Sequence, residues 1–348
     1  MDASLISLLQ QLIATPSFSR EEKAAADILE NWMRTQGLPV QRKGNNVWCE
    51  QPGRGDGRPV VLLNAHIDTV RPAVGYTRDP FAPTLEGDVL YGLGSNDDGG
   101  SLIALLAAYR ELCRRPQPCR FIFSATAEEE VCGLGGIEQM LEEVGPIDFG
   151  IVGEPTCMQM AVAEKGLLVL DCTAHGQSGH AARNEGVNAL YRAMDDIAWF
   201  RSYQFEKVSD YLGPVKMTVT GIQAGTQHNV IPDTCTFMVD VRPNGMYANS
   251  EIVDIIRRHV GCDVVPRSLR HNSSHTPASH PVVKRGTALG LTAFGSPTTS
   301  NQTLLSFTTL KIGPGDSARS HTADEFIRLS EIEQGIDIYV RLLDGLQL

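Results

Sequence analysis

The sequence predicts an α/β fold in which helices cover a sheet and a smaller α+β module is inserted into the chain. Two observations predict it. In the first half of the chain, short apolar strand-like runs alternate with amphipathic helix-like segments, which is typical of a sheet covered by helices. From residue 165 to residue 272 the order changes to strand, helix, strand, strand, helix, strand, which is the order of a self-contained module. A chain of 348 residues is long enough for about two domains.

Two amphipathic helices are expected near the N-terminus. In the first, leucines recur at helical spacing, at Leu5, Leu8, Leu9 and Leu12. Before the second, Ser19 is followed three residues later by Glu22, and this pattern predicts a capping box. Gly37 suits the end of that helix, because glycine is common just beyond a helix C-terminus.

Three short apolar runs are expected to be buried strands, and each leads directly into polar residues. The runs are Val60–Leu63, Arg120–Ser124 and Phe149–Val152, and an apolar helix is expected at about 101–113. In an open α/β sheet, ligands bind at the carboxyl ends of the strands. The polar residues that follow these runs, or lie in the glycine-rich loop before the helix, are His66, Asp68, Asp97, Glu129, Glu130 and Glu154. Imidazole and carboxylate groups gathered at one edge suit zinc or a similar divalent ion.

The inserted module contains half-buried strands. Apolar and mostly polar residues alternate from Cys235 to Arg242, as in an antiparallel strand with one buried face. Strands are expected at residues 167–173, 214–221, 234–241 and 262–265, and helices at about 186–199 and 250–260. The polar stretch 272–277 is expected to be a hinge, after which helices at 282–289 and from about residue 330 complete the first domain.

The charge and composition exclude several classes of partner. With 30 Lys and Arg against 41 Asp and Glu, the formal net charge is −11, which repels a phosphate backbone or an anionic membrane surface. We therefore expect no nucleic-acid partner and no membrane partner, and the longest apolar run, 102–108, is far shorter than a membrane span of about 20 residues. The eight cysteines form no CxxC pair, and the N-terminus lacks the basic segment of a signal peptide, so we expect a cytoplasmic protein with reduced thiols.

The polar motifs occur in an order that resembles a known family. They are His66-Ile67-Asp68, Gly94-Ser95-Asn96-Asp97, Thr126-Ala127-Glu128-Glu129-Glu130, Gly153-Glu154-Pro155-Thr156, Gly179-His180-Ala181, Asn229-Val230-Ile231-Pro232, and Gly313-Pro314-Gly315-Asp316 leading to His321. Together they resemble the M20 metallopeptidases and amidohydrolases, which include acetylornithine deacetylases, succinyl-diaminopimelate desuccinylases, aminoacylases and carboxypeptidases. The resemblance extends over essentially the whole chain.

The resemblance implies two divalent metal ions, which we expect to be zinc, with cobalt able to replace it. It implies as ligands His66 and Glu154 on one metal, Glu130 and His321 on the other, and Asp97 bridging both. Glu129 is expected to be the general base. Asp68 is expected to hydrogen-bond the free ring nitrogen of His66 and so fix its tautomer.

The triple glutamate leaves two assignments of the base open. The family usually has Asp-Glu-Glu at this point. When the motif is aligned through Thr126, Glu128 takes the place of the aspartate, so Glu129 is the base and Glu130 a ligand. A shift of one residue would make Glu128 the base instead. We favour the first assignment.

The inserted module supplies a second set of residues under the resemblance. His180 resembles the histidine that helps to stabilise the oxyanion, within its own subunit or across from a partner. Asn229 and Arg242 match positions that bind substrate, and the forked guanidinium of an arginine suits a carboxylate.

The chain departs from the family pattern in two places. The family commonly has Asp-Met-Lys-Gly after the bridging position, whereas this chain reads Asp97-Asp98-Gly99-Gly100, so the role of the usual lysine is unsupported here. Where relatives often carry Thr-Ser-Asp, this chain reads Thr299-Ser300-Asn301, which puts a substrate role for Asn301 in doubt.

The sequence and the resemblance together predict a discontinuous enzyme of two domains. A zinc-dependent exopeptidase-like α/β catalytic domain is expected at 1–164 and 273–348, and a ferredoxin-like lid and dimerisation domain at 165–272, giving a homodimer. The expected reaction is hydrolysis of the amide bond of a small N-acyl amino acid. Acetylornithine deacetylases of arginine biosynthesis, acting on N-acetyl- or N-succinyl-ornithine or -citrulline, are the best match. Succinyl-diaminopimelate desuccinylase and an M20 dipeptidase or carboxypeptidase stay open as alternatives.

Other classes of protein fit less well. The run Gly176-Gln177-Ser178-Gly179 lacks the spacing of a serine hydrolase elbow, and Gly133-Leu134-Gly135-Gly136 matches neither a Rossmann fingerprint nor a P-loop. A non-catalytic binding protein of the same fold is the alternative from another class. Such a relative would be expected to have lost ligands or the base, and all of them are present here.

Overall fold

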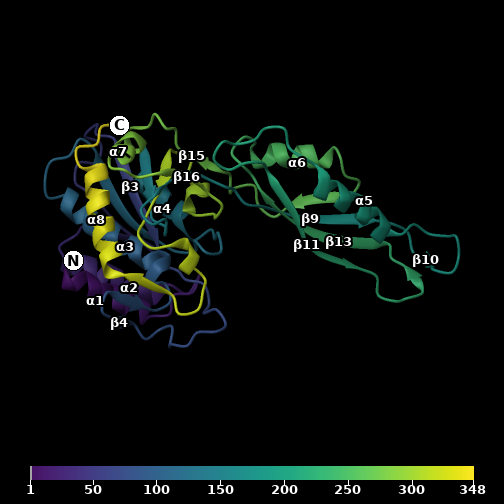
Figure 1. Cartoon of the computed structure of the whole chain (residues 1–348), viewed down its shortest axis with the longest axis horizontal. Coiled ribbons are helices and arrows are strands. Elements are labelled where there is room, and N and C mark those ends of the chain that lie inside the picture. Colours follow the sequence, from purple (N-terminus) through teal and green to yellow (C-terminus); the bar gives the residue numbers. More distant parts are fainter. Residues whose placement is uncertain (1) are drawn as a thin grey trace. The chain divides into compact units, whose positions relative to one another are not determined.

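The computed structural model describes residues 2–348, which fold as two units (Figure 1). The first unit is formed by residues 2–162, Thr276–Phe294 and Ser300–Leu348. The second is formed by Ala163–His275 and Gly295–Thr299. The second unit is therefore an insertion in the first. The sequence prediction placed its last short segment, Gly295–Thr299, in the first domain.

The first unit is built around a mixed sheet whose central strands are parallel. The strands follow the order β1-β2-β6-β3-β7-β17-β8, with β3 parallel to both β6 and β7. Their bounds are Val40–Lys43 (β1), Asn46–Glu50 (β2), Val60–His66 (β3), Arg120–Thr126 (β6), Phe149–Val152 (β7), Met160–Glu164 (β8) and Thr309–Lys311 (β17). Two short strands, β15 and β16, pair with β8, and of these β15 and the two residues it pairs with belong to the second unit. A separate small sheet has the order β18-β5-β4. The bounds of these short strands are Thr84–Glu86 (β4), Val89–Tyr91 (β5), Ser274–His275 (β15), Ala293–Ser296 (β16) and Phe326–Arg328 (β18).

Helices cover both faces of this sheet. Successive side chains of β3 therefore enter two different apolar cores, one on each face. Val61 and Leu63 belong to a large core shared with α1, α2, α3 and α8, whereas Val60 and Leu62 belong to a smaller core shared with α4. The helices are Ala3–Ile13 (α1), Lys23–Thr35 (α2), Gly100–Leu112 (α3), Ile137–Val144 (α4), Pro281–Ala288 (α7) and Leu329–Leu343 (α8). Nearly every residue of α3 is buried, which explains why this helix is apolar on all sides.

Ser19 does not begin the second helix, contrary to the predicted capping box. The helix α2 begins at Lys23, and its N-cap residue Glu22 makes no capping bond through its side chain. The hydroxyl of Ser19 instead donates to Oδ2 of Asp68 at 2.7 Å. The buried carboxylate of Glu22 accepts from the backbone N–H of Glu128 at 3.2 Å. Contacts with distant loops therefore replace the local cap that the spacing predicted.

The second unit is a ferredoxin-like α+β module, and the predicted fold class is confirmed. Its sheet has the order β11-β13-β9-β14, and each neighbouring pair is antiparallel. Alternate residues of β13 from Cys235 to Val241 face a core shared with α5 and α6, as their alternation predicts. The elements are Leu168–His175 (β9), Gly179–His180 (β10), Ala189–Ser202 (α5), Lys216–Ala224 (β11), Val230–Ile231 (β12), Thr234–Arg242 (β13), Asn249–Arg257 (α6) and Asp263–Pro266 (β14).

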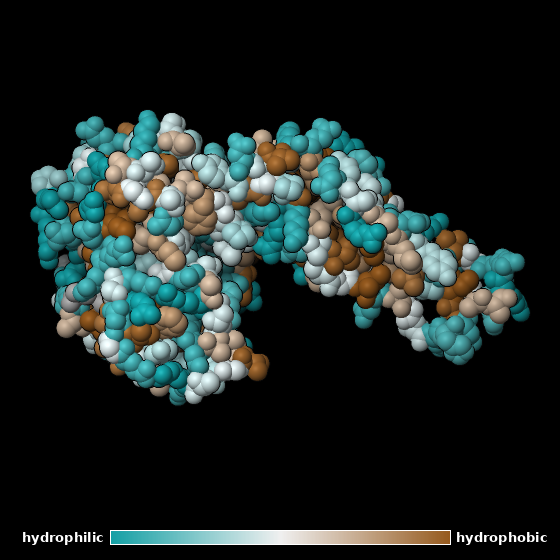
Figure 2. Space-filling model, in the orientation of Figure 1, coloured by the Kyte–Doolittle hydropathy of each residue, from teal (hydrophilic) through white to brown (hydrophobic). Residues whose placement is uncertain are grey.

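Large apolar side chains are exposed on the second unit. Tyr191 and Met194 of α5 are 66% and 56% exposed, and Ile222 of β11 is 53% exposed. Figure 2 shows hydrophobic surface in the region where Figure 1 labels α5 and β11. Among residues 2–348, none of the helices has the length and apolar character that crossing a lipid bilayer requires.

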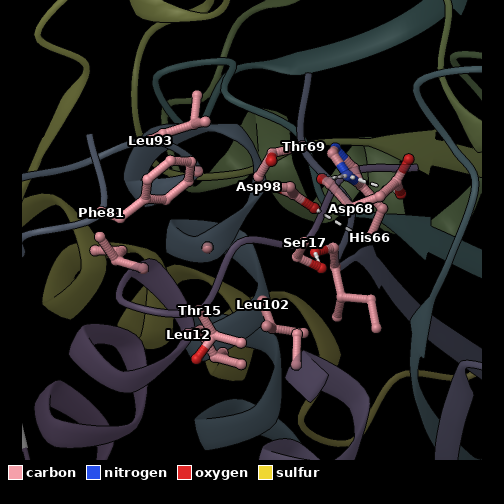
Figure 3. A pocket seen from close by; sticks show the side chains of 15 residues that line it. Leu12, Thr15, Ser17, His66, Asp68, Thr69, Phe81, Leu93, Asp98 and Leu102 are labelled. Atoms are coloured by element: carbon pink, nitrogen blue, oxygen red, sulfur yellow. Dashed lines mark hydrogen bonds and ion pairs between the residues drawn. The ribbon is translucent and has the colours of Figure 1, made fainter. Parts of the chain in front are cut away.

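A small cavity of about 30 Å³ lies in the first unit at the carboxyl end of β3 (Figure 3). Apolar side chains of α1 and α3, including Leu12 and Leu102, line one part of it. His66, Asp68 and Asp98 line another part. The cavity therefore marks where the apolar core gives way to a polar cluster at the edge of the sheet.

Candidate metal centre

Parallel pairing brings the predicted ligands to one edge of the sheet. His66 is the last residue of β3, the glutamate run follows β6, and Glu154 comes two residues after β7. Because β6 and β7 flank β3 in parallel, the three carboxyl ends lie next to one another. Asp97 arrives from the short helical turn Ser95–Gly99 (η1) before α3, and His321 from the loop after the turn Ser317–Arg319 (η3).

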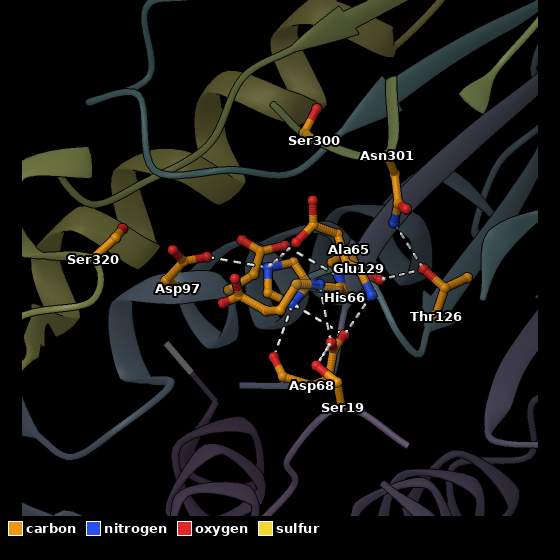
Figure 4. A network of polar contacts seen from close by, with 12 residues as sticks. Ser19, Ala65, His66, Asp68, Asp97, Thr126, Glu129, Ser300, Asn301 and Ser320 are labelled. Atoms are coloured by element: carbon orange, nitrogen blue, oxygen red, sulfur yellow. Dashed lines mark hydrogen bonds and ion pairs between the residues drawn. The ribbon is translucent and has the colours of Figure 1, made fainter. Parts of the chain in front are cut away.

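The two histidines meet different carboxylates, and Asp97 lies near both of them; Figure 4 shows Asp97 beside His66. Nε2 of His66 lies 3.1 Å from Oδ1 of Asp97 and 4.0 Å from Oε2 of Glu129. Nε2 of His321 lies 3.0 Å from Oε2 of Glu130 and 3.8 Å from Oδ2 of Asp97. Asp97 thus offers one oxygen to each histidine, which is the arrangement that a bridging ligand requires.

The donor set fits divalent metal ions. Single ligand atoms of His66, Asp97 and Glu130 lie within 4.8 Å of one another, and so do those of His66, Glu129 and Glu154. Imidazole nitrogens and carboxylate oxygens are the ligands that zinc takes at catalytic sites. The structure therefore brings the five predicted ligands into one cluster, together with the predicted base.

Asp68 holds this cluster in place. Nδ1 of His66 lies 2.9 Å from the backbone oxygen of Asp68, which leaves Nε2 directed at Asp97. The carboxylate of Asp68 accepts from the backbone N–H groups of Glu129 and Glu130, at 3.0 and 3.1 Å, and from the hydroxyl of Ser19. The ring of His66 is therefore held chiefly by the backbone oxygen of Asp68 and not, as predicted, by its carboxylate, whose Oδ1 lies 3.5 Å from Nδ1. The buried carboxylate of Asp68 positions the loop that carries the two glutamates.

Burial and crowded negative charge shift the pKa values of the cluster. Burial raises the pKa of Glu129 well above its ordinary range, and the charges of Glu130, Asp68 and Asp97 add to the shift. Burial also raises the pKa of Glu154, with the charges of Asp97 and Glu129 adding to it. For His66, burial favours the neutral ring, but its hydrogen bonds with Asp68 and Asp97 outweigh burial and raise the pKa well above its usual range. Cations bound here would relieve this repulsion.

The side chain of Glu128 turns away from the cluster. Its Oε2 accepts from the backbone N–H of Gly135 at 3.3 Å and lies 3.8 Å from Nε of Arg20. A Cβ atom at Gly133 or Gly135 would collide with this carboxylate, so the two glycines make room for it. Only Glu129 and Glu130 of the run point to the histidines, which supports the assignment of Glu129 as the base.

Glu325 is a positioning residue that the sequence reasoning missed. It is 2% exposed, and its carboxylate accepts from the backbone N–H groups of Gly94, Asn96 and Asp97 at 2.8 to 3.1 Å. Burial raises the pKa of Glu325 to about 7. It lies 228 residues from Asp97 in the chain, so no local spacing pattern relates the two.

Two further buried residues, Asn96 and Asp98, position the site, and the sequence reasoning did not predict this role. Oδ1 of Asn96 accepts from the backbone N–H of Asp316 at 3.0 Å, and its Nδ2 donates to Ser320 Oγ at 3.3 Å, so Asn96 fixes the loop that leads to His321. Oδ2 of Asp98 accepts from the backbone N–H of His66 at 3.3 Å and pins the end of β3.

Asn301 is part of a buried network in the first unit. Its Nδ2 donates to Oδ1 of Asn64 and to Oγ1 of Thr126, both at 3.2 Å (Figure 4). Asn64 lies two residues before His66 on β3, and Thr126 pairs with His66 across the sheet. Asn301 therefore braces the strands that carry the cluster.

The residues predicted for the oxyanion and the substrate lie in the second unit. His180 and Asn229 are exposed, and Nδ1 of His180 accepts from the backbone N–H of Ala182 at 3.1 Å. Arg242 ends β13, and its guanidinium pairs with Asp240 through two hydrogen bonds of 2.8 and 3.0 Å. The forked donor that was predicted for a substrate carboxylate is thus engaged within the unit, and the roles of all three residues stay predictions.

Comparison with known proteins identifies the family. The sequence profile described as peptidase family M20/M25/M40 matches residues 62–345, which is most of the chain. The chain belongs to this family. The predicted resemblance to the M20 metallopeptidases is thereby confirmed.

Relatives of this M20 chain match it over almost its full length. An acetylornithine deacetylase of Proteus mirabilis is 28% identical over 375 residues, covering 98% of this chain and 96% of its own. A succinyl-diaminopimelate desuccinylase of Delftia acidovorans is 26% identical over 382 residues, covering 98% of both.

Solved structures share the fold of this M20 chain. The aminopeptidase PepT of Bacillus cereus superimposes with a TM-score of 0.77 at 19% identity, covering 97% of each chain. The YXEP protein of Bacillus subtilis, a dinuclear metal-binding peptidase of the M20 family, gives a TM-score of 0.74 at 16% identity, covering 99% of this chain and 98% of its own.

Proposed function

We propose that the protein hydrolyses the amide bond of an N-acyl amino acid at a centre of two zinc ions. His66 and Glu154 would hold one ion, Glu130 and His321 the other, and Asp97 would bridge them. The observation that carries the proposal is the position of Asp97, with one carboxylate oxygen toward each histidine. Family membership supports the hydrolytic class, and the dinuclear centre of the YXEP protein supports two ions.

The side chains of the cluster suit amide hydrolysis. Bound divalent ions would supply a Lewis acid for the scissile carbonyl and lower the pKa of water. Glu129, which pairs with no arginine or lysine among residues 2–348, would take a proton from the attacking water and pass it to the leaving nitrogen as the carbon–nitrogen bond breaks. Asp68 would keep the His66 ring oriented throughout the reaction.

Support for a substrate class comes from the relatives rather than from the pocket. An acetylornithine deacetylase and a succinyl-diaminopimelate desuccinylase both match at nearly full length, and both names describe removal of an acyl group from an acylated amino acid. We therefore propose N-acetyl- or N-succinyl-ornithine or -citrulline as substrate, with a role in arginine biosynthesis. Succinyl-diaminopimelate desuccinylation is the second candidate, which the 26% identity to the Delftia enzyme favours.

A substrate panel tests the proposed function. N-acetyl- and N-succinyl-ornithine, -citrulline and -diaminopimelate would be assayed beside dipeptides, with zinc or cobalt added to the purified protein. We expect the N-acyl amino acids to be cleaved fastest. Fast cleavage of dipeptides without cleavage of any N-acyl amino acid would reject the deacylase assignment in favour of a peptidase.

We also propose that the second unit joins two copies of the chain into a homodimer. The strand β11 is an edge of its sheet, so its outer backbone groups have no strand partner within residues 2–348. The apolar residue Ile222 on this strand and Tyr191 and Met194 on α5 are more than half exposed. A second copy of the same edge and helix would cover both features at once.

A further inference from the structure

A second cavity, of about 260 Å³, lies beside the metal centre in the first unit. We call it the Arg71 pocket, and its lining consists of Phe18, Ser19, Thr69, Val70, Arg71, Glu130 and Val131. Whole ligands occupy pockets of about 300–1,000 Å³, so a cavity of this size suits one substituent of a substrate. Glu130 belongs both to this lining and to the predicted ligands, which places the pocket directly next to the reacting amide.

The walls of the Arg71 pocket are held by tertiary contacts. Phe18 and Thr69 form a parallel β-bridge, and the backbone N–H of Thr69 donates to the oxygen of Ser17 at 2.8 Å. Phe18 also meets the ring of Phe81 edge to face, with the centroids 6.0 Å apart. The segment before α2 and the loop after β3 are therefore fastened together, which makes the pocket a preformed feature of the unit.

Arg71 is the single basic residue in this lining. Its Cζ atom lies 4.5 Å from the centroid of Phe18, and this cation–π contact holds the guanidinium plane at the pocket. The nearest ion pair is with Glu21 at 3.4 Å, and the two side chains are 73% and 63% exposed. Such an exposed pair is weak, so a ligand carboxylate can displace it.

Arg71 gives the pocket a charge that favours an anion, although Glu130 also lines it. Glu130 is the only acidic residue in the lining, and its carboxylate is directed at His321, 3.0 Å away. Arg71 lines the same cavity, and its guanidinium could donate two parallel hydrogen bonds to a carboxylate.

We propose that the Arg71 pocket is a subsite that binds a carboxylate of the substrate, and that Arg71 determines specificity for substrates carrying it. The carboxylate belongs either to a dicarboxylic acyl group or to the amino acid itself. The inference rests on the proposed function, because it places the scissile amide at the metal centre beside Glu130.

Three substrates distinguish the two sources of the carboxylate. We would measure kcat/KM of the zinc-loaded protein and its Arg71→Gln variant for N-succinyl-L-ornithine, N-acetyl-L-ornithine and N-acetyl-L-ornithinamide. If the acyl carboxylate binds, the variant loses at least about tenfold more on the succinyl substrate than on the acetyl substrate, chiefly through KM. If the amino-acid carboxylate binds, the variant loses a similar factor in kcat/KM on N-succinyl-L-ornithine and N-acetyl-L-ornithine, and loses least on N-acetyl-L-ornithinamide. An equal loss on all three, or no loss, would overturn the proposal.

A binding experiment without turnover separates this inference from the proposed function. The zinc-loaded protein would be titrated calorimetrically with succinate and with succinamate, in which a neutral amide replaces one carboxylate. We expect the wild-type protein to bind succinate at least about tenfold more tightly, and Arg71→Gln to abolish the preference. If no amide is hydrolysed but this preference exists, the proposed function fails and the subsite stands. Absence of both the preference and any selective loss in kcat/KM would reject the subsite.

The matched control is Arg20→Gln. Arg20 is 70% exposed, lies 3.8 Å from Glu128, and does not line the Arg71 pocket. The substitution Arg20→Gln removes one positive charge, as Arg71→Gln does, from a position next to the pocket residue Ser19. We expect it to leave the preference for succinate intact, and an equal loss in both variants would show a general effect of charge and contradict the proposal.

Discussion

Neighbouring glutamates in this protein have different surroundings, and the differences support the roles proposed for them. Glu130 pairs with His321, and Glu128 accepts from the backbone of Gly135. Glu129 lies near His66 and pairs with no lysine or arginine in the part of the chain that the structure describes. The backbone explains the divergence, because Glu128 adopts a left-handed conformation with φ of 56°. This turn lets two consecutive carboxylates enter the cluster while the first leaves it.

Replacing Glu129 tests its role as the base. We expect Glu129→Gln to lower kcat by about 10²–10⁴-fold, because the amide cannot take the proton, while the metal content stays unchanged. Steady-state kinetics and elemental analysis would measure both quantities. Glu128→Gln is the matched control and should keep near wild-type turnover. If Glu128→Gln is the inactive variant instead, the assignment of the base shifts by one residue.

The raised pKa values predict that metal binding releases protons. In the metal-free protein, burial and mutual repulsion raise the pKa values of Glu129 and Glu154, so both hold protons to higher pH than ordinary glutamates. Metal ligands must be deprotonated, so zinc affinity should rise with pH and fall as the solution is acidified. Calorimetric titration with zinc near pH 7, repeated in buffers of different ionisation enthalpy, would measure the release. Binding with no buffer dependence would contradict this prediction.

At the scale of elements, the strands could be predicted but several of their connections could not. The apolar runs at 60–63, 120–124 and 149–152 are β3, β6 and β7, because buried parallel strands are continuously apolar. Each motif residue at a strand end could therefore be placed at one edge of the sheet. The prediction that a helix begins at Ser19 was wrong, because the Ser19 hydroxyl donates to Asp68, which lies 49 residues away in the sequence.

The residues that brace the centre were the least predictable part of the site. Glu325 reaches Asp97 across 228 residues, and Asn301 reaches Asn64 across 237. Such partners are adjacent only after folding, and neither sits in a local motif whose spacing reports the contact. The candidate ligands at strand ends could be placed from their strands, and the resemblance implied the loop residues Asp97 and His321, whereas the supporting hydrogen bonds depend on how whole loops pack.

The loop that carries His321 depends on a glycine. Gly315 has φ of 87°, and a Cβ atom there would meet Oδ1 of Asn96, the acceptor for the backbone of Asp316. We expect Gly315→Ala to cost about 1–2 kcal/mol from the left-handed conformation. It should also weaken the second metal site, because His321 is displaced. Denaturant unfolding and zinc titration would measure the two effects.

Gly345→Ala is the control for this loop. Gly345 also has a positive φ, of 64°, but open space surrounds the position of its Cβ atom. We expect a similar loss of stability with two metal ions still bound. Equal metal binding by both variants would show that the packing of Asn96 against Gly315 does not position His321.

At the scale of the whole molecule, we expect only one of the two edge strands of the second unit's sheet to form a dimer interface. We expect a homodimer through β11, so Ile222→Lys should give a monomeric mass at micromolar concentration. Val265, which is 59% exposed on the opposite edge strand β14, offers the control Val265→Lys, which should stay dimeric. Light scattering would measure the mass. A wild-type protein that is already monomeric would reject the dimer.

The central claim is that the cluster at the end of β3 binds two metal ions on which amide hydrolysis depends. The most direct measurement is a zinc titration of chelator-treated protein in which bound metal per chain and hydrolysis of N-acetyl-L-ornithine are followed together. We predict no turnover without metal and two ions bound per chain at full activity. Full activity after removal of metal, or saturation at a single bound ion, would contradict the account.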